Sequence, residues 1–272
     1  MKNKIWLVLL LLIGIICKIY FVKSTFGGKG DENLYERFKS RFNVVKGKRQ
    51  LNDVDMVYAI TMPNRKEYIT KQINTLGVTC TYFDAISPKD LTTEDYDTLS
   101  SINNPRSDIF KKYTRLAVLL SFILCFMDSL EKGYSTIIVF EDDMSINVDL
   151  QTLNESLTEF KNSYCDIFYM GYCFLNCNQL LYINKYKKLV EIPNRDLLCC
   201  HSMCIKTKVL PGLIEYCFPM NFNSDELFRN YYMMNDITIC VPRTVYFIQN
   251  RASLESLNES EEDPEFFKTC KF

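Results

Sequence analysis

Three consecutive carboxylates, Glu141-Asp142-Asp143, directly follow the apolar run Thr136-Ile-Ile-Val-Phe140. Such a run predicts a buried strand, and the acids would lie at its carboxyl end, where open α/β sheets bind ligands. Adjacent carboxylates repel one another and cost free energy to desolvate unless a cation lies among them. Hard divalent cations prefer oxygen ligands, and a phosphate-bearing substrate often completes their coordination shell. The triplet therefore suggests a metal site, with a solvated capping turn as the alternative.

Two other places could take part in the same chemistry. Arg65 lies just beyond the first expected strand, in a connection to a helix where an arginine can pair with phosphate. A solvated arginine that opens a helix is the alternative. Asp225 and Glu226 stand at an expected helix start, where carboxylates favour the helix dipole. Capping therefore competes with a catalytic role for this pair.

These residues need a sheet to position them, and the hydrophobic pattern predicts one. From Val54 onward strand-like and helix-like segments alternate, which favours one α/β domain over residues 54–272 with a mainly parallel central sheet flanked by helices. The expected strands are 56–61, 81–86, 136–140, 166–171, 198–205, 237–241 and 245–247. The expected helices are 66–76, 111–132, 150–160, 208–217 and 224–234, with Gly77 and Gly133 as helix ends and Ser224 as an N-cap.

Bulk composition indicates a globular protein and disfavours nucleic-acid binding. The chain has 272 residues, of which 47% are hydrophobic and 24% charged, so it can bury a sizeable core. Its net charge is -1, whereas nucleic-acid-binding domains are usually basic. A basic run does extend from Arg37 to Arg49, in a polar segment without clear periodicity. We expect residues 24–53 to form a solvated stem.

The N-terminus has the pattern of a targeting element. Met1-Lys-Asn-Lys4 is a positive flank, and the mostly apolar residues 5–22 are just long enough to cross a bilayer. No small-x-small cleavage site follows, so residues 1–23 are expected to be an uncleaved signal anchor rather than a cleaved signal peptide. The leading lysines favour a cytosolic N-terminus. We therefore expect a single-pass type II membrane protein whose domain faces the lumen of the endoplasmic reticulum or Golgi.

Twelve cysteines are many for a cytosolic protein. Three of them lie in apolar runs and are expected to be small core residues: Cys125, Cys165 and Cys240. Two pairs have spacings too loose to favour zinc, so disulfides or packing are expected for Cys173 with Cys177 and for Cys200 with Cys204. Two sequons, at Asn154 and Asn258, agree with a lumenal domain, although such triplets also occur by chance.

The order of several motifs along the chain is itself informative. The segment Lys111-Lys-Tyr-Thr-Arg-Leu-Ala-Val-Leu-Leu-Ser121 precedes Ile138-Val-Phe-Glu-Asp-Asp143. There follow Asp166-Ile-Phe-Tyr-Met-Gly171, Cys200-His-Ser-Met203, Asn223-Ser-Asp-Glu226, and a closing Pro242 and Gln249. In this order the motifs resemble glycosyltransferase family 25, which includes collagen β-galactosyltransferases and bacterial lipooligosaccharide galactosyltransferases. The resemblance covers nearly the whole of the chain after the expected stem.

The resemblance implies a GT-A-like fold and transfer of a hexose, galactose or glucose, from a UDP-sugar to a protein, glycan or lipid-linked acceptor, with Mn²⁺. It implies that Asp143 is the direct metal ligand and that Asp142 supports the metal or the donor. Donor contacts would come from Thr61, Arg65, Asp84, Glu141 and Asp142. Catalytic roles at the acceptor hydroxyl or donor sugar would fall to Asp225 and Glu226. His201, the single histidine, is expected to be a satisfied strand residue rather than a ligand.

Some positions depart from the family's motifs and leave a second interpretation open. Thr61 stands where the first motif has asparagine, and Arg115 and Phe122 replace a glutamate and a histidine of the helical motif. The alternative is a catalytically inactive relative that binds or scaffolds partners in the secretory pathway. A phosphotransferase or hydrolase ranks last, because the chain has no phosphate-cradling glycine loop and no Walker-type lysine.

Overall fold

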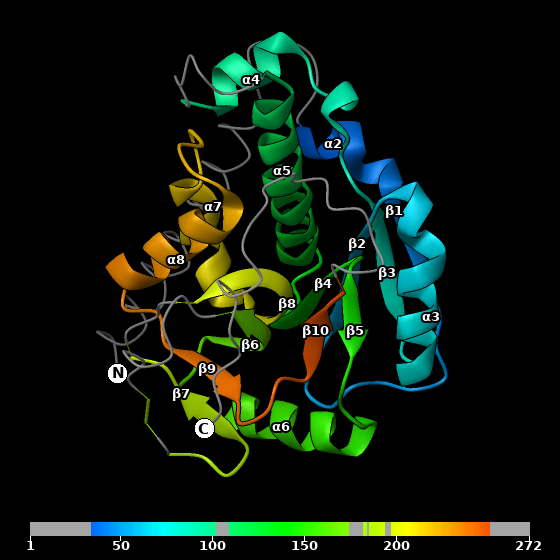
Figure 1. The fold of residues 1–272 in the computed structure, drawn as a ribbon, viewed down its shortest axis with the longest axis vertical. Helices are drawn as coiled ribbons and strands as arrows, with labels where there is room; N and C mark the ends of the chain where they lie inside the picture. Colours follow the sequence, from blue (N-terminus) through cyan, green and yellow to red (C-terminus); the bar gives the residue numbers. More distant parts are fainter. Residues whose placement is uncertain (1–33, 102–108, 174–181, 184, 194–196, 251–272) are drawn as a thin grey trace, which may run out of the picture.

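The computed structural model describes residues 34–101, 109–173, 182–183, 185–193 and 197–250, and these build one large sheet (Figure 1). Its strand order is β1-β3-β2-β4-β8-β6-β9-β7. The strands are β1 (Phe42–Val45), β2 (Met56–Thr61), β3 (Cys80–Asp84), β4 (Thr136–Glu141), β6 (Ile167–Cys173), β7 (Leu189–Glu191), β8 (Leu198–Lys206) and β9 (Ile239–Pro242). Strands β2, β3, β4, β6 and β9 run in one direction, and β1, β7 and β8 oppose them. The expected mainly parallel sheet is therefore confirmed, with β8 inserted antiparallel between β4 and β6.

Helices cover both faces of this sheet (Figure 1). One apolar cluster joins the sheet to α2 (Leu34–Phe38), α4 (Thr93–Leu99), α5 (Ile109–Glu131), α7 (Leu210–Tyr216) and α8 (Ser224–Met234). A second cluster joins the opposite face to α3 (Lys66–Leu76) and α6 (Leu150–Asn162). Short 3-10 turns occur at Pro63–Arg65, Pro88–Asp90 and Thr207–Val209. The arrangement is a three-layer α/β/α sandwich.

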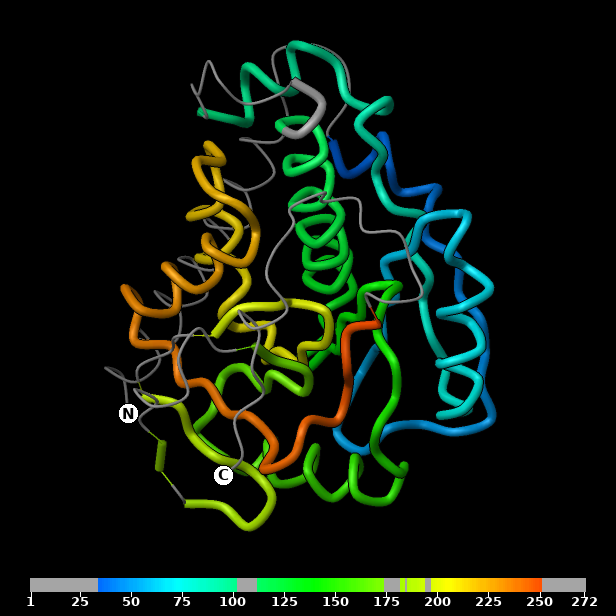
Figure 2. The backbone as a smooth tube through the Cα atoms, viewed as in Figure 1, coloured from blue at the N-terminus to red at the C-terminus, as the bar shows by residue number. Residues whose placement is uncertain are grey.

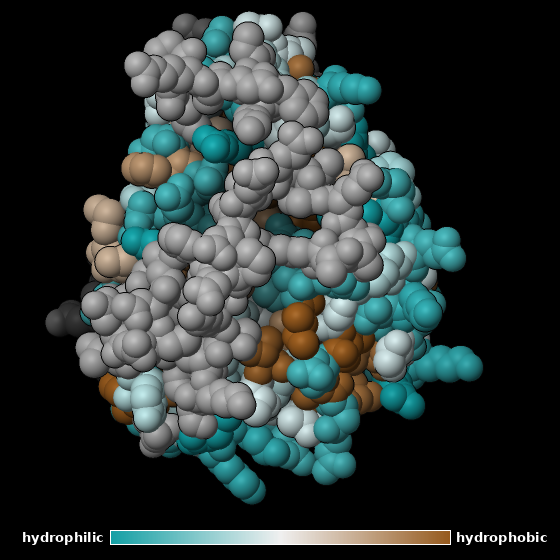
Figure 3. Space-filling view, in the orientation of Figure 1, coloured by the Kyte–Doolittle hydropathy of each residue, from teal (hydrophilic) through white to brown (hydrophobic). Residues whose placement is uncertain are grey.

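A separate two-stranded ribbon lies beside the carboxyl end of β4. It pairs β5 (Met144–Ile146) with β10 (Phe247–Gln249), which are far apart in sequence but adjacent in space (Figure 2). Buried Phe247 packs on Phe140 of β4, with ring centroids 4.9 Å apart. Apolar side chains gather on the surface over this ribbon (Figure 3), and Ile248 is 48% exposed there. The ribbon thus connects the end of the described chain to the strand that carries the acids.

Part of the expected stem belongs to the domain. Leu34, Tyr35 and Phe38 of α2 are buried in the first apolar cluster, and β1 pairs antiparallel with β3 at the edge of the sheet. The apolar residues that anchor this segment are few and separated by charged ones, so its sequence has the polar character of a linker. The folded unit therefore includes residues from Leu34 onward, well before the expected boundary at Val54.

Most expected elements are present, and the differences have simple causes. The strand at 56–61 and the helix at 66–76 coincide with β2 and α3. Gly77 and Gly133 end their helices with φ of 68° and 69°. The N-cap of α8 is Asn223 rather than Ser224, because the Asn223 side chain accepts from the third helical residue while Glu226 reaches back to the Asn223 backbone.

Two cysteines expected to be core residues are bonded to each other. Cys165 and Cys240 form a disulfide between the starts of β6 and β9, although both lie in apolar runs. Cys173 forms a second disulfide with Cys199. The expected core role of Cys125 is confirmed by its burial as a free thiol, and Cys200 and Cys204 are also free and buried.

The expected membrane anchor at residues 1–23 lies outside the described part of the chain, as do Cys177 and Asn258. Among the described helices, Lys112–Glu131 has the length and mean hydropathy, 1.5, of a membrane-spanning segment. However, 78% of that stretch is buried inside the domain, and buried core helices commonly have this composition.

Candidate active site

The carboxyl ends of β2, β3 and β4 bring three candidate residues to one edge of the sheet. Thr61 lies opposite Asp84, and Ile60 lies opposite Glu141, in the parallel register. Thr61 is fully buried, and its hydroxyl donates to the Met62 carbonyl at 3.0 Å. Asp84 accepts from the Lys66 ammonium at 2.8 Å. Their backbones lie at the edge of the sheet where α/β proteins bind ligands. The side chains of Thr61 and Asp84 make contacts with nearby protein groups.

Asp142 holds the connection that follows β2. It is 7% exposed, and its two oxygens accept from the Met62 backbone N–H at 2.7 Å and from Arg65 Nη1 at 3.1 Å. Burial raises the pKa of the Asp142 carboxyl, against the opposing effect of the Met62 hydrogen bond and the Arg65 charge. Arg65 therefore pairs with Asp142, and the ion pair ties the β2–α3 connection to the turn after β4.

Asp143 is held differently, although it is the next residue. Its Oδ2 accepts from Gln249 Nε2 at 2.8 Å, and its carbonyl accepts from the Asn250 N–H at 2.7 Å. Its Oδ1 is buried and has no hydrogen-bond partner in the described structure. A buried carboxylate oxygen without a partner costs free energy and calls for a ligand such as an ion or water. Asp143 therefore has the donor atom that a hard divalent cation requires.

Glu141, Asp142 and Asp143 do not converge on one point. Within the described residues, no three histidine, cysteine, aspartate or glutamate side chains are grouped closely enough to hold a metal ion. Both oxygens of Asp142 already accept hydrogen bonds, from the Met62 N–H and from Arg65. Among the described carboxylates, Asp143 has a buried oxygen, Oδ1, without a hydrogen-bond partner, and a shell with that donor would be completed by substrate and water.

The start of α8 contacts the start of β8. Asp225 accepts from the Cys199 backbone N–H at 3.2 Å. Cys199 has a φ of 69° and is bonded to Cys173, so this donor is fixed by a disulfide and an unusual backbone conformation. The thiol of Cys200 is fully buried, which raises its pKa, as do Asp225 and then Glu141. Asp225 and Glu141 thus both act on the same β8 residue.

Glu226 and His201 have structural partners. Glu226 accepts from the Asn223 backbone N–H at 3.4 Å within the capping box of α8. His201 is buried on β8, and its Nε2 lies 3.1 Å from the Phe247 carbonyl. The same ring lies against Gly171, where a Cβ would be 2.1 Å from Nε2, so only glycine fits there. His201 therefore lies on a strand as expected, but it is only partly satisfied, because its buried Nδ1 makes no hydrogen bond within the described residues.

A model of glycosyltransferase family 25, described as LPS biosynthesis protein, matches residues 57–228. That match takes in β2, the acidic triplet and the start of α8. The chain belongs to glycosyltransferase family 25. No curated protein sequence gives a significant match.

Solved structures with some likeness to this family 25 chain are nucleotide-sugar enzymes. A UDP-glucose pyrophosphorylase complexed with UDP-glucose has a TM-score of 0.39 and 9% identity, covering 72% of this chain and 91% of that one. A protein crystallised as a glucose-1-phosphate thymidylyltransferase from Bacillus anthracis, with a sucrose, has a TM-score of 0.36 and 12% identity, covering 71% and 69%. Likenesses this weak carry no conclusion about fold or function.

The family's helical motif has a clear structural role here. Ser121 of α5 accepts from the Ile86 N–H at 3.0 Å and so holds the connection after β3. Phe122, where the family 25 motif has histidine, is buried against Phe126 and Phe228, with centroids 6.2 and 5.7 Å away. In this family member the position is part of the apolar core between α5 and α8.

Three contributors to the site could not be singled out from sequence. Gln249 and Asn250 reach Asp143 from β10, more than a hundred residues away, and Lys66 neutralises Asp84. Gln249 resembles part of the closing motif of the family, but no local pattern indicates which carboxylate it contacts.

Proposed function

We propose that this family 25 member is a metal-dependent glycosyltransferase that moves a hexose from a UDP-sugar to an acceptor hydroxyl. The observation that carries the proposal is the Oδ1 of Asp143, which is buried without a hydrogen-bond partner in the described structure. It lies just after the carboxyl end of β4, inside the segment that matches the family. A structural acid would be satisfied by its neighbours, as Asp142 is. An acid that presents one oxygen suits a metal that also binds substrate phosphates.

Asp143 would hold the cation, with Mn²⁺ as our candidate. When bound, the ion neutralises the negative charge that develops on the departing diphosphate. Asp142 contributes by a different route. Its ion pair with Arg65 and its hydrogen bond from Met62 fix the β2–α3 connection beside Asp143. Glu141, Thr61 and Asp84 line the same sheet edge, where the nucleotide would lie.

Asp225 is our candidate for activating the acceptor. The acceptor oxygen would attack the anomeric carbon, the bond from that carbon to the diphosphate oxygen would break, and the acceptor proton would pass to the Asp225 carboxylate. The Cys199 N–H donates to one oxygen of Asp225 and so holds this carboxylate in place. Glu226 remains bound to the start of α8 in this scheme.

The cellular setting proposed here rests on the N-terminal sequence. An anchor at residues 1–23 would make the chain a type II membrane protein with its domain in the endoplasmic reticulum or Golgi lumen. Two disulfides support an oxidising compartment. UDP-galactose and UDP-glucose are the donors proposed, with a protein, glycan or lipid-linked acceptor.

Release of UDP from a panel of UDP-sugars, with Mn²⁺ and with EDTA, tests the proposal directly. We expect slow hydrolysis of one donor that requires Mn²⁺. Asp143→Ala should abolish it while the melting temperature stays within a few degrees, because among the described residues the Asp143 side chain is bound by the Gln249 amide, and water could replace that contact. Turnover by Asp143→Ala at the wild-type rate would contradict the mechanism.

The buried Phe122 favours a second candidate, an inactive family member that binds a partner. Its aromatic ring fills a position where the family's motif has a polar histidine. UDP with Mn²⁺ should raise the melting temperature of an active transferase, because a ligand that binds only the folded state stabilises it. Absence of both this shift and UDP release would favour the inactive form.

A further inference from the structure

The end of β10 contacts Asp143 through two neighbouring residues. The Gln249 amide donates to Asp143 Oδ2 at 2.8 Å, and the Asn250 backbone N–H donates to the Asp143 carbonyl at 2.7 Å. An ionised carboxylate only accepts hydrogen bonds, so the amide nitrogen of Gln249 must face it. Both the side chain and the backbone of Asp143 are therefore held from one strand end.

That strand end is itself fastened to α3. The Asn250 amide donates to the Tyr68 hydroxyl at 3.0 Å, and Tyr68 shares a short hydrogen bond with Ser145 of β5. The Ile146 N–H of β5 donates to Gln72 of α3 at 3.2 Å. Because α3, β5 and β10 are linked in this way, Gln249 is a fixed donor rather than a mobile surface amide.

The hydrogen bond from Gln249 fixes the orientation of the Asp143 carboxylate. A carboxylate can rotate about its Cβ–Cγ bond, and its two oxygens are chemically equivalent. With one oxygen, Oδ2, bound to Gln249, the direction of the other is set, and this oxygen, Oδ1, has no partner in the described structure.

We propose that Gln249 is a positioning residue for the metal site: its amide holds Asp143 so that Oδ1 alone is presented to the cation. The inference rests on the proposed function, since it assigns Gln249 a role toward the ligand that Asp143 would bind. Partners that orient a metal ligand typically change metal affinity by about 10- to 100-fold when they are removed. Gln249 acts through Asp143 and needs no contact with substrate.

The test is Mn²⁺ binding to the full chain, measured by the electron paramagnetic resonance signal of free Mn²⁺ in the presence of UDP. We expect Gln249→Leu, which removes the donor but keeps the side-chain volume, to weaken Mn²⁺ binding by about 10-fold or more. UDP release should be restored toward the wild-type rate by raising Mn²⁺, because Asp143 itself is intact. A purely structural role would lower the rate at every Mn²⁺ concentration.

Gln151→Leu is the matched control. Gln151 donates to Glu155 at 3.0 Å on the exposed surface of α6, so the same amide-to-carboxylate bond is lost away from the site. It should leave Mn²⁺ binding unchanged. Melting temperatures in EDTA show whether Gln249→Leu is folded, and Gln249→Glu provides a second variant. Its added carboxylate would repel Asp143 without metal, so Mn²⁺ should stabilise this variant more than it stabilises the wild type.

The outcomes separate this inference from the proposed function. Wild-type chain that binds Mn²⁺, together with Gln249→Leu that binds it equally well, would overturn the role of Gln249 and leave the transferase proposal standing. A smaller Mn²⁺-induced stabilisation of Gln249→Glu than of wild type would also overturn it. Wild-type chain that binds no Mn²⁺ would overturn the metal-dependent function and this inference together.

Discussion

Asp128 is a carboxylate that is 2% exposed in the core between α2, β2 and α5. It accepts from the Tyr35 hydroxyl at 2.9 Å, the Tyr58 hydroxyl at 2.5 Å and the Lys132 ammonium at 2.8 Å. A buried carboxylate is tolerated only when such donors surround it. The cluster therefore stabilises the attachment of α2 as well as the acid itself.

Because of these tyrosines, the free energy of unfolding of the domain should fall at alkaline pH. Burial, and then the hydrogen bond to Asp128, raises the pKa of Tyr58; burial, followed by Glu131 and Asp128, raises that of Tyr35. Above the ordinary value of 10.0 the unfolded chain releases these protons while the folded chain keeps them. The stabilisation is therefore complete below that pH and is lost as pH rises above it, because the folded state then binds more protons.

We expect the free energy of unfolding to fall between about pH 9 and about pH 11 in urea titrations. Tyr58→Phe should reduce the slope of that fall and cost about 1–3 kcal/mol near neutral pH, since Asp128 loses a donor. Tyr164→Phe, at a side chain that is 86% exposed, is the matched control and should change neither value. An unchanged slope in Tyr58→Phe would contradict the assignment.

The acidic triplet shows how far single residues could be interpreted from sequence. Its location at the end of a buried strand could be predicted, because the apolar run before it indicates such a strand. Which acid is structural could not be predicted, since Met62, Arg65 and Gln249 come from other segments and their contacts depend on the fold. Asp142 and Asp143 have the same side chain and differ only in these partners.

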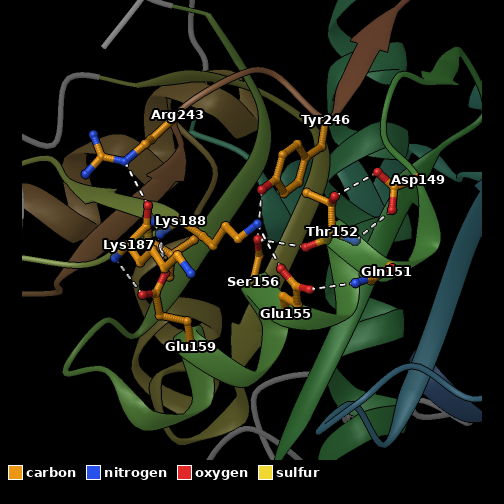
Figure 4. Close-up of polar contacts among 11 residues, drawn as sticks. Asp149, Gln151, Thr152, Glu155, Ser156, Glu159, Lys187, Lys188, Arg243 and Tyr246 are labelled. Carbon is orange, nitrogen blue, oxygen red and sulfur yellow. Dashed lines mark hydrogen bonds and ion pairs between the residues drawn. The ribbon is translucent and has the colours of Figure 1, made fainter.

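At the scale of elements, Glu159 of α6 holds the segment that leads into β7. Its two oxygens accept from three backbone N–H groups, those of Lys187 at 2.6 Å, Lys188 at 2.7 Å and Leu189 at 3.1 Å. Arg243 binds the same segment from the other side, donating to the Lys187 carbonyl at 3.0 Å (Figure 4). The segment is therefore fixed between α6 and the end of β9.

Glu159→Gln should destabilise the domain by about 1–3 kcal/mol, because an amide nitrogen replaces one of the accepting oxygens. Glu155→Gln is the matched control, one turn earlier on α6. Glu155 is exposed and pairs with the Lys188 ammonium, so its change should have little effect (Figure 4). Urea unfolding gives the free energy of unfolding of both variants. Equal losses would contradict the stabilising role of the three backbone contacts of Glu159.

The two disulfides lie at different distances from the site and should separate stability from activity. Cys165–Cys240 closes 75 residues and Cys173–Cys199 closes 26, so loss of the first should cost more stability in a chain-entropy account. Cys199 also donates to Asp225 from a φ of 69°. Cys173→Ala with Cys199→Ala should therefore slow sugar transfer more than Cys165→Ala with Cys240→Ala.

Transfer rates and unfolding curves of the two double variants check this prediction. Both pairs tie β6 to a neighbouring segment, so they are closely matched. A larger loss of transfer in the Cys165 and Cys240 variant would contradict a specific role for the Cys199 N–H.

For the whole molecule, the segment before Val54 should be required for folding. Leu34, Tyr35 and Phe38 are buried, and burial of each such side chain contributes about 1.5–3 kcal/mol. Arg37 and Arg41 add ion pairs to Asp95 and Asp90. A chain that begins at Val54 should melt far below one that begins at Lys29, or fail to fold. Circular dichroism melts of the two chains decide this, and equal melting temperatures would contradict it.

The layers of the fold were predicted more fully than its connections. Apolar residues at helical spacing predict α3 and α5, and short apolar runs rich in β-branched residues predict β2 and β4. Periodicity carries no information on strand direction, so the antiparallel insertion of β8 was not predicted. Strand β1 falls within the expected stem, because the segment around it is polar and lacks clear periodicity, and β7 is only three residues long. Short edge elements have little apolar signal of their own.

The position of β8 between β4 and β6 has a consequence for biosynthesis. Strands β1 to β4 leave the ribosome first, yet the neighbour that covers β4 begins at Leu198. At about 5–20 residues per second, the strand bearing the acids remains an open edge for several seconds after it is made. During that interval its N–H and C=O groups can pair with other extended chains. Translation speed between Glu141 and Lys206 therefore sets how long a nascent chain needs protection by chaperones.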